Sequence, residues 1–332
     1  MSQITLSDRN MRSSLKKFSR VSKPQILGAR YAELQRLFDL FGKSDKGIQV
    51  LYFGDSVIER TAHEDIDKRS LGQMLVDELT GKVKSVYLSH SAYHSQIYYY
   101  LVLALTQQMT MRPQLVILPV NLRSFSPQWD LNPDWQFEEE IKAIQKFLLN
   151  PVAIPRLRKH YHKKHRYQIF DQTTVYYPYS TITQIGEFRR LISSNPSTFQ
   201  EEAMRQREIF NFHYMTPLSI RHPKVKYLQL AVEQLISVGI KVICYSTPVN
   251  YKLGERLVGE RATVLLRENV DVIRRATHFY QQNNGLQFWN YTFLLDSVYF
   301  FHPDLLTEHL NQYGRREIAS RISQLILGSC NS

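Results

Sequence analysis

Two short polar motifs near opposite ends of the chain contain the residue types that acyl-transfer chemistry requires. The first is Gly-Asp-Ser at 54–56, which directly follows the apolar run 48–53. The second is the segment 307–315, which contains His309. A serine hydroxyl needs a base to become nucleophilic, and histidine is the usual base because its unperturbed pKa lies near neutrality. Ser56 is therefore the candidate nucleophile and His309 its candidate base.

Both motifs also have a plain structural interpretation. Gly-Asp-Ser can be a simple turn in which Asp55 or Ser56 caps a helix. The chain has 11 histidines, so a single one carries little weight by itself. What strengthens the Ser56 motif is the apolar run before it, since open α/β sheets bind ligands just beyond the carboxyl ends of their strands.

Apolar runs alternate with amphipathic segments along most of the chain, which predicts strands alternating with helices. The predicted strands span 48–53, 83–88, 115–120, 240–245 and 286–289. The predicted helices span 34–41, 71–79, 93–109, 198–210, 225–238, 257–283 and 315–327. Such alternation favours an α/β fold, in which helices cover both faces of a mostly parallel sheet.

The alternation lapses between residues 121 and 223, which divides the chain into three parts. We expect a basic N-terminal arm and helix over 1–45, and an α/β core formed by 46–120 together with 224–328. The stretch 121–223 is then an insertion or cap, mostly helical and irregular. Most of the candidate chemistry lies in the predicted core.

Taken together, the two motifs resemble the SGNH/GDSL hydrolase superfamily. The resemblance implies a three-layer α/β/α fold with a flavodoxin-like central sheet, in which Ser56 attacks an ester and His309 is the base. It also places Asn121, directly after the predicted strand 115–120, as an oxyanion donor beside the backbone N–H of Ser56. A tetrahedral intermediate needs such donors around its negative oxygen.

The chain departs from the family pattern at three points. The third block, 119–122, keeps only the asparagine of the usual Gly-x-Asn-Asp. The second block, 88–94, lacks the usual glycine, so the backbone amide of Ser91 or Ala92 would have to complete the oxyanion site. The positions two and three residues before His309, where the family places its acid, hold Thr307 and Leu306.

Several groups could replace the missing acid. We favour Asp304 as the residue that orients His309, with Glu308 and Asp296 as alternatives. A backbone carbonyl could also orient the ring, which would leave a Ser-His dyad and slower turnover.

Residues near the predicted strand ends are candidates for substrate binding. Arg123 and Asn250 follow the third and fourth predicted strands and could contact the substrate, although ordinary loop polarity also explains them. Trp129 and Trp135 could stack against a sugar, or they could form the core of the cap.

Composition excludes several functional classes. Only two cysteines occur, so neither a disulfide scaffold nor a cysteine metal site is expected. The net charge of +12 is concentrated in two basic blocks, 1–30 and 156–167, which we interpret as solvated surface with no specific nucleic-acid partner. A metal site at His160, His162 and His165 is not expected, because no carboxylate accompanies them and the block is positive. No cofactor is expected.

The longest apolar run is far shorter than the about 20 residues that span a bilayer, and the first residues do not resemble a secretory signal. A cytoplasmic location is the default expectation. The predicted function is a serine esterase or acyltransferase acting on a small-molecule or saccharide ester, with acetylated saccharides as a family-implied class. The alternative is a catalytically impaired module that binds a glycan or anionic polymer. The oligomeric state is left open.

Overall fold

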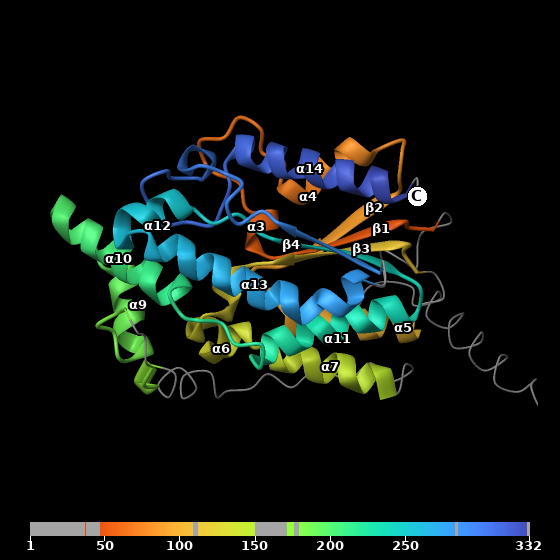
Figure 1. Cartoon of the computed structure of the whole chain (residues 1–332), viewed down its shortest axis with the longest axis horizontal. Helices are drawn as coiled ribbons and strands as arrows, with labels where there is room; N and C mark the ends of the chain where they lie inside the picture. The colour runs from red at the N-terminus through yellow and green to blue at the C-terminus, as the bar shows by residue number, and fades with distance from the viewer. Residues whose placement is uncertain are drawn as a thin grey trace, which may run out of the picture.

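The computed structural model describes residues 37, 47–108, 112–149, 171–175, 179–282 and 285–330, and its centre is a five-stranded sheet (Figure 1). The strands are β1 Val50–Gly54, β2 Ser85–Ser89, β3 Leu115–Val120, β4 Lys241–Ser246 and β5 Leu286–Asn290. They are all parallel and lie in the order β2-β1-β3-β4-β5. This is the flavodoxin-like order. The predicted α/β fold with a mostly parallel sheet is confirmed.

Side chains of the inner strands alternate between two apolar layers, which explains why their sequences are apolar throughout. In β1, Val50 and Tyr52 pack into one layer, whereas Leu51 and Phe53 pack into the other. All four are almost completely buried. Both faces of the sheet therefore need a covering of helices.

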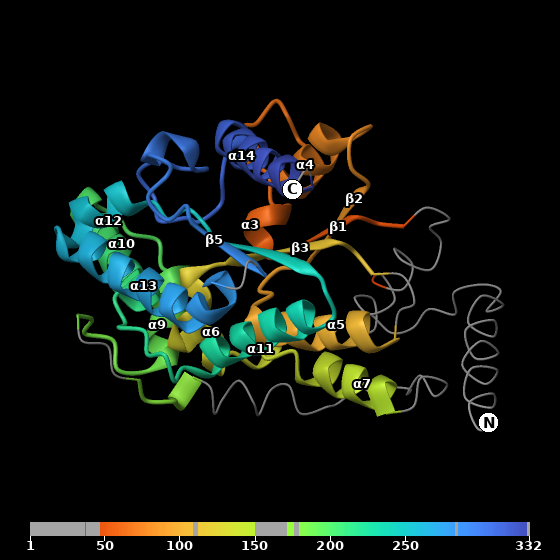
Figure 2. The same cartoon turned by 45° about the vertical axis from the view of Figure 1, so that its right-hand side comes forward.

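One face is covered by α4 (Leu71–Leu79) and α14 (Gln312–Cys330), which lie side by side in both views (Figures 1 and 2). Ser70 begins α4 by accepting a hydrogen bond from the backbone N–H of Gln73 at 3.1 Å, as a helix N-cap does. Buried residues of both helices share one apolar layer with β1, β3 and β4.

The opposite face is covered by α5 (Ser95–Gln108), α11 (Pro223–Ser237) and α13 (Arg261–Gln282) (Figure 2). The prediction of one helix over 257–283 is wrong at its start. The chain instead forms α12 (Tyr251–Val258) and then α13, separated at Gly259. Gly259 has a φ of 79°, a left-handed conformation that glycine adopts freely and that ends a helix.

Short helical elements connect β3 to α11. They are η1 (Leu122–Phe125), α6 (Pro127–Leu131), η2 (Pro133–Trp135), α7 (Glu138–Leu149), α9 (Ile185–Ser193) and α10 (Phe199–Tyr214). Of these, α7 packs on α5, and α10 packs on α12 and α13. The division of the chain into core and insertion stays a prediction.

Several expectations fall outside the described residues. They are the basic arm 1–30, most of the predicted helix 34–41, and the basic block 156–167 with its three histidines. Within the described ranges, no helix has both the length and the apolar composition needed to cross a bilayer.

Candidate active site

The turn after β1 presents Ser56 as the first residue of the short helix α3 (Ser56–Glu59). Asp55 caps this helix, because its Oδ1 accepts a hydrogen bond from the backbone N–H of Val57 at 2.8 Å. Gly54 makes the turn possible, since a Cβ at that position would lie 2.5 Å from the side chain of Ile58. The capping interpretation of the motif is therefore correct, and it leaves the Ser56 hydroxyl free of the cap.

His309 lies on the loop that joins β5 to α14, 253 residues along the chain from Ser56. Its Nε2 is 3.2 Å from the Ser56 Oγ, which is within hydrogen-bond distance. Ser56 is buried, with 7% of its surface exposed. The fold thus brings the predicted nucleophile and the predicted base together at the carboxyl edge of the sheet.

Backbone contacts hold the His309 loop in place. The carbonyl of His309 accepts a hydrogen bond from the Phe301 N–H at 2.9 Å, and Leu310 forms an isolated antiparallel bridge with Phe300. Short backbone links of this kind fix the direction in which the imidazole points.

Arg315, at the start of α14, adds a second restraint on that loop. It is fully buried, and its Nη1 donates to the Leu310 carbonyl at 2.8 Å and to the Asp65 carboxylate at 2.6 Å. Its Nε and Nη2 donate to the carbonyls of Arg69 and Asp67. This clamp joins α14 and the His309 loop to the segment that follows α3. Breaking a buried pair of this kind is costly because one charge stays buried without a partner.

The Nδ1 of His309 has a hydroxyl neighbour in place of a carboxylate. Thr307 Oγ1 lies 3.3 Å from Nδ1 and also accepts a hydrogen bond from the His309 backbone N–H at 3.1 Å. If Nδ1 carries the proton and donates to Thr307, Nε2 is left as the acceptor that faces Ser56. A neutral hydroxyl can select this tautomer, but it cannot balance an imidazolium charge.

The expectation that Asp304 orients His309 is not met. The Asp304 carboxylate is 81% exposed and pairs with Arg256 at 2.9 Å. Asp296 also lies elsewhere, because its Oδ1 accepts a 3.5 Å hydrogen bond from the Tyr251 hydroxyl. The loop carries both carboxylates toward α12, and their sequence distance from His309 could not show this.

Glu308 is the carboxylate that lies close to the base. It is buried, its Oε2 pairs with Arg123, and its Oε1 is 3.8 Å from His309 Nε2. Burial alone would raise the pKa of this carboxyl, but the charges of Arg123 and His309 together lower it below the usual value. Glu308 is therefore ionised at neutral pH and places a negative charge beside the imidazole.

Arg123 was predicted to contact substrate, but the structure gives its side chain internal partners. Besides Glu308, its guanidinium lies over the ring of Trp129, 4.8 Å from the centroid. A role in holding Glu308 ionised fits these contacts better than a direct role in substrate binding.

The surroundings of His309 favour the neutral form of its imidazole. Burial lowers its pKa below the usual value, the charge of Glu308 raises it, and the charges of Arg60 and Arg123 lower it again. The net direction is downward, so the ring is unprotonated at neutral pH and able to accept a proton.

This balance predicts the pH dependence of a Glu308→Gln variant. Because Glu308 raises the pKa of His309, its removal should move that pKa further down. A base works only when unprotonated, so the acid limb of the kcat/KM profile should shift to lower pH. A pH–rate profile on a chromogenic acetyl ester measures the shift. Glu317→Gln, which removes an exposed partner of Arg321, is the control; an acid limb that stays in place or moves up would contradict the prediction.

The three predicted oxyanion donors follow three neighbouring strands. Asn121, after β3, donates one amide hydrogen from Nδ2 to Asp55 Oδ2 at 2.9 Å, and its Oδ1 accepts from the Arg123 N–H. The second amide hydrogen of Asn121 is not used by these bonds. Within the described residues, the backbone amides of Ser56 and Ala92 donate to no acceptor. The oxyanion role of these three groups stays a prediction.

Ala92 occupies a position that suits glycine. Its φ is 68°, the left-handed region that L-residues seldom adopt. The sequence lacks the glycine that the SGNH/GDSL family has in its second block, and Ala92 adopts a backbone conformation typical of glycine there. It lies on the loop after β2, whose last residues pair with β1 beside Ser56.

Burial of Asp55 gives the site a second unusual acid. Burial raises the pKa of Asp55 to about 6, against the opposing hydrogen bonds from Asn121 and Val57. The Asp55–Asn121 hydrogen bond links the turn that carries Ser56 to the predicted oxyanion donor. In the sequence, this hydrogen bond is indicated only by a Gly-Asp-Ser motif after one predicted strand and a polar residue after another.

The side chain of Asn250 has internal partners, and its contact with substrate stays a prediction. Asn250 is 1% exposed and caps α12 by accepting from the Leu253 N–H. Its Nδ2 donates to the Pro303 carbonyl, and its Oδ1 accepts from the Ser297 hydroxyl. These bonds use the side chain to tether the loop before His309.

The proposed sugar platform at Trp129 is likewise not seen. Trp129 is buried, and its ring centroid is 4.3 Å from that of Trp135. Its Nε1 donates to the Ala92 carbonyl at 3.4 Å. The tryptophan pair belongs to the interior of the segment after β3, the second of the two interpretations that the sequence allowed.

Metal binding finds no support in the described part of the chain, where no group of three or more His, Cys, Asp or Glu side chains could hold an ion. The histidines 160, 162 and 165 fall outside that part.

Sequence reasoning missed Thr307 as a ring partner and Arg315 as the clamp. Thr307 had been noticed only as a departure, because it occupies one of the two positions where an acid was sought. Arg315 follows a glycine at the start of a helix, and nothing in its neighbours distinguishes it from a surface arginine.

Comparison with known proteins gives structural neighbours only. No protein-family model and no curated protein matches the sequence. Among solved structures, the chain is similar to an aryl esterase of M. smegmatis, with 11% identity, a TM-score of 0.38, and coverage of 84% of this chain and 98% of that one.

Two further structures match at a similar level. A carbohydrate acetylesterase family member from Sinorhizobium meliloti has 10% identity and a TM-score of 0.37, covering 84% of this chain and 97% of that one. An acetylxylan esterase from Geobacillus stearothermophilus has 11% identity and a TM-score of 0.38, covering 86% and 95%. At these identities and TM-scores the likeness is remote, so the functional conclusion has to come from the geometry of the site.

Proposed function

We propose that this chain is a divergent serine esterase or acyltransferase of the SGNH/GDSL type. The observation that carries the proposal is the 3.2 Å contact between Ser56 Oγ and His309 Nε2 at the carboxyl edge of a parallel sheet. Ligands bind at this edge in open α/β folds. A buried serine hydroxyl in contact with a neutral imidazole is the arrangement that nucleophilic acyl transfer requires.

In the first step, the Ser56 Oγ attacks the acyl carbonyl carbon while His309 Nε2 takes the hydroxyl proton. A C–O bond forms, and the carbonyl π pair moves onto its oxygen. The Ser56 and Ala92 amides and the free amide hydrogen of Asn121 supply the donors for that oxygen. Collapse of the intermediate expels the alkoxide, which takes the proton from His309, and leaves an acyl-Ser56.

In the second step, an acceptor hydroxyl gives its proton to His309, and its oxygen attacks the acyl carbon. The bond from that carbon to the Ser56 Oγ then breaks, and His309 returns the proton to Oγ. Water as acceptor makes the protein a hydrolase, and an alcohol makes it a transferase. Glu308 stabilises the imidazolium in both steps, because its ionised carboxylate lies 3.8 Å from Nε2. It takes over the electrostatic function of the missing acid from the opposite side of the ring.

The resemblance to the superfamily extends the proposal to O-acetylated saccharides as acyl donors. Acetyl release from an acetylated oligosaccharide, measured beside release from a small chromogenic acetate, tests this extension separately. If the protein releases acetate from the small ester but from no acetylated saccharide, the extension fails and the protein is a small-ester hydrolase.

A covalent label tests the proposal directly. A fluorophosphonate probe reacts with an activated serine, so the wild type should be labelled at Ser56 and the Ser56→Ala variant should not. Ser237→Ala, which removes an exposed hydroxyl at the end of α11, is the matched control and should label like the wild type. A folded wild type that is not labelled would overturn the proposal and favour a non-catalytic module that binds a glycan or anionic polymer.

A further inference from the structure

The loop after β2 forms a tight turn over residues 90–93, which a hydrogen bond from the Tyr93 N–H to the His90 carbonyl closes at 3.1 Å. Ala92, its third residue, has a φ of 68°, whereas Ser91 before it does not have a positive φ. This combination defines a type II turn. The third position of such a turn suits glycine, because L-residues seldom adopt a positive φ.

The type of this turn decides where the Ala92 N–H points. A type I turn has a φ of about −90° at its third residue and a ψ of about −30° at its second, where a type II turn has about +80° and +120°. The two types therefore differ by nearly half a rotation of the peptide between Ser91 and Ala92. The N–H and C=O of a trans peptide point in opposite directions, so conversion to type I would turn the Ala92 N–H to the other side of the loop.

The imidazole of His90 is in a position to prevent that rotation. Its Nδ1 lies 2.8 Å from the Ser91 carbonyl oxygen, which belongs to the same peptide as the Ala92 N–H. A carbonyl can only accept, so in this hydrogen bond Nδ1 is the donor. The ring packs against the rings of Tyr93 and Phe137, with centroids 5.3 Å and 5.9 Å away. Rotation of the peptide would break this hydrogen bond.

Glu59 holds the turn against the helix that carries the candidate nucleophile. Its two carboxylate oxygens accept hydrogen bonds from the Ser89 hydroxyl at 3.1 Å and from the Ser91 hydroxyl at 3.5 Å. Because Glu59 ends α3 and Ser56 begins it, these bonds place the turn beside Ser56.

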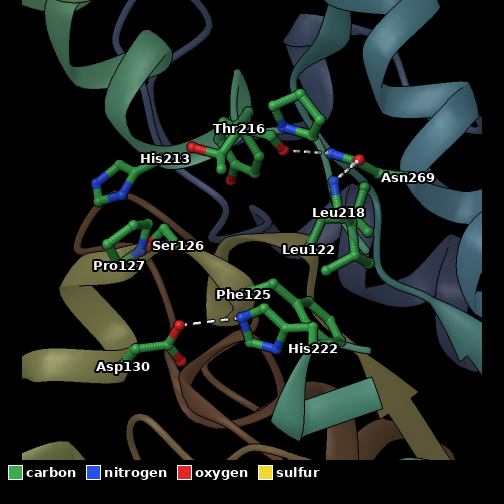
Figure 3. Close-up of a pocket in the computed structure, with 12 residues that line it drawn as sticks. Leu122, Phe125, Ser126, Pro127, Asp130, His213, Thr216, Leu218, His222 and Asn269 are labelled. Atoms are coloured by element: carbon green, nitrogen blue, oxygen red, sulfur yellow. Dashed lines mark hydrogen bonds and ion pairs between the residues drawn. The ribbon is translucent and has the colours of Figure 1, made fainter. Parts of the chain in front are cut away.

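The carbonyl of Ala92 is held from the other side. It accepts a hydrogen bond from the Trp129 Nε1 at 3.4 Å. Trp129 lies on α6, and the next residue, Asp130, is bound by His222 Nε2 at 3.0 Å, as Figure 3 shows, and by Lys224 Nζ at 2.8 Å. These bonds anchor α6 to the start of α11. The residues on both sides of the central peptide are thus fixed, and its rotation is left to the imidazole.

We propose that His90 is a positioning residue, which holds the peptide between Ser91 and Ala92 so that the Ala92 N–H faces the acyl oxygen of a substrate at Ser56. The proposal rests on the proposed function, in which this N–H is an oxyanion donor. His90 touches no reacting atom and acts through the peptide. It gives an alanine the backbone direction that a glycine adopts freely.

Steady-state kinetics on an activated acetyl ester tests the role of His90. His90→Phe keeps an aromatic ring but removes the Nδ1 donor. It should lower kcat by about 10- to 100-fold, less than the about 10²–10³-fold of a lost oxyanion donor, because the type II turn is still sampled. KM should change little. His90→Asn, whose amide can donate in place of Nδ1, should recover most of the lost kcat. His278→Phe, which changes an exposed histidine of α13, is the control and should keep the wild-type rate.

A second variant tests whether His90 acts through the turn. Ala92→Gly removes the resistance to positive φ, so His90→Phe should cost much less kcat in the Ala92→Gly background than in the wild type. An equal loss of kcat in the two backgrounds would overturn the proposal, as would a loss in KM alone or no recovery in His90→Asn.

The fluorophosphonate label separates this proposal from the proposed function. If the wild type is labelled at Ser56 but His90→Phe keeps the wild-type kcat, this proposal fails and the proposed function stands. A wild type that is not labelled overturns both. Because His90 is exposed, the variants should fold, which circular dichroism checks. Should His90→Phe not fold, His90→Ala also lacks the donor and is measured in its place, with the same expectations.

Discussion

Replacement of His309 by Gln should lower kcat/KM for an activated acetyl ester by at least about 10³-fold. Glutamine can keep a hydrogen bond to the Ser56 hydroxyl, but it cannot accept the proton. The buried hydroxyl would then have to ionise without a base, and the alkoxide leaving group would have no acid. The loss should appear in kcat, because in the proposed mechanism the imidazole acts on the reacting atoms and not on substrate binding.

The control for this variant is His278→Gln, which changes an exposed histidine of α13 that is not among the site residues. It should retain the wild-type rate. Thermal unfolding of both variants checks that the fold is kept. A His309→Gln protein within tenfold of the wild-type kcat/KM would show that the imidazole is not the base, whatever its distance from Ser56.

Replacement of Asn121 by Ala should lower kcat by about 10²–10³-fold, the usual effect of losing one oxyanion donor. KM should change little, because the amide interacts most strongly with the negative oxygen of the transition state. The change also removes the 2.9 Å hydrogen bond to Asp55 and leaves that buried carboxyl with one donor fewer. Some loss of stability is therefore expected beside the loss of rate.

Steady-state kinetics beside unfolding curves separates these two effects. Asn211→Ala is the matched control, since Asn211 is equally buried and its amide donates to the Tyr179 carbonyl in another part of the molecule. It should lose stability and keep its kcat. If Asn121→Ala lost no more rate than Asn211→Ala, Asn121 would be a structural residue only.

The sequence predicted the sheet well because each strand is a short apolar run followed by a turn. β3 was predicted to the residue, and the other strands within about two residues. Once the strands are parallel, residues just after them must lie at one edge, which is why Ser56 could be named from its place after an apolar run. Asn121 also follows a strand, but its expected role came from the resemblance to the SGNH/GDSL superfamily.

Side-chain pairing across loops could not be predicted in the same way. Asp304 is close to His309 in sequence, yet the loop turns its carboxylate to Arg256. The ion pair between Glu308 and Arg123 joins residues 185 positions apart, and no local sequence pattern predicts it. Such contacts depend on the path of irregular backbone, which neither periodicity nor composition describes.

The clamp formed by Arg315 has a consequence for the protein during its synthesis. A ribosome completes the Ser56 turn early, but it adds His309 and the helix that carries Arg315 only some 250 residues later. Until that helix docks and its guanidinium meets Asp65, a nascent chain has a serine without a base. Any acyl-transfer reactivity would therefore arise only when α14 packs on the sheet, so that chains still being synthesised do not react with esters.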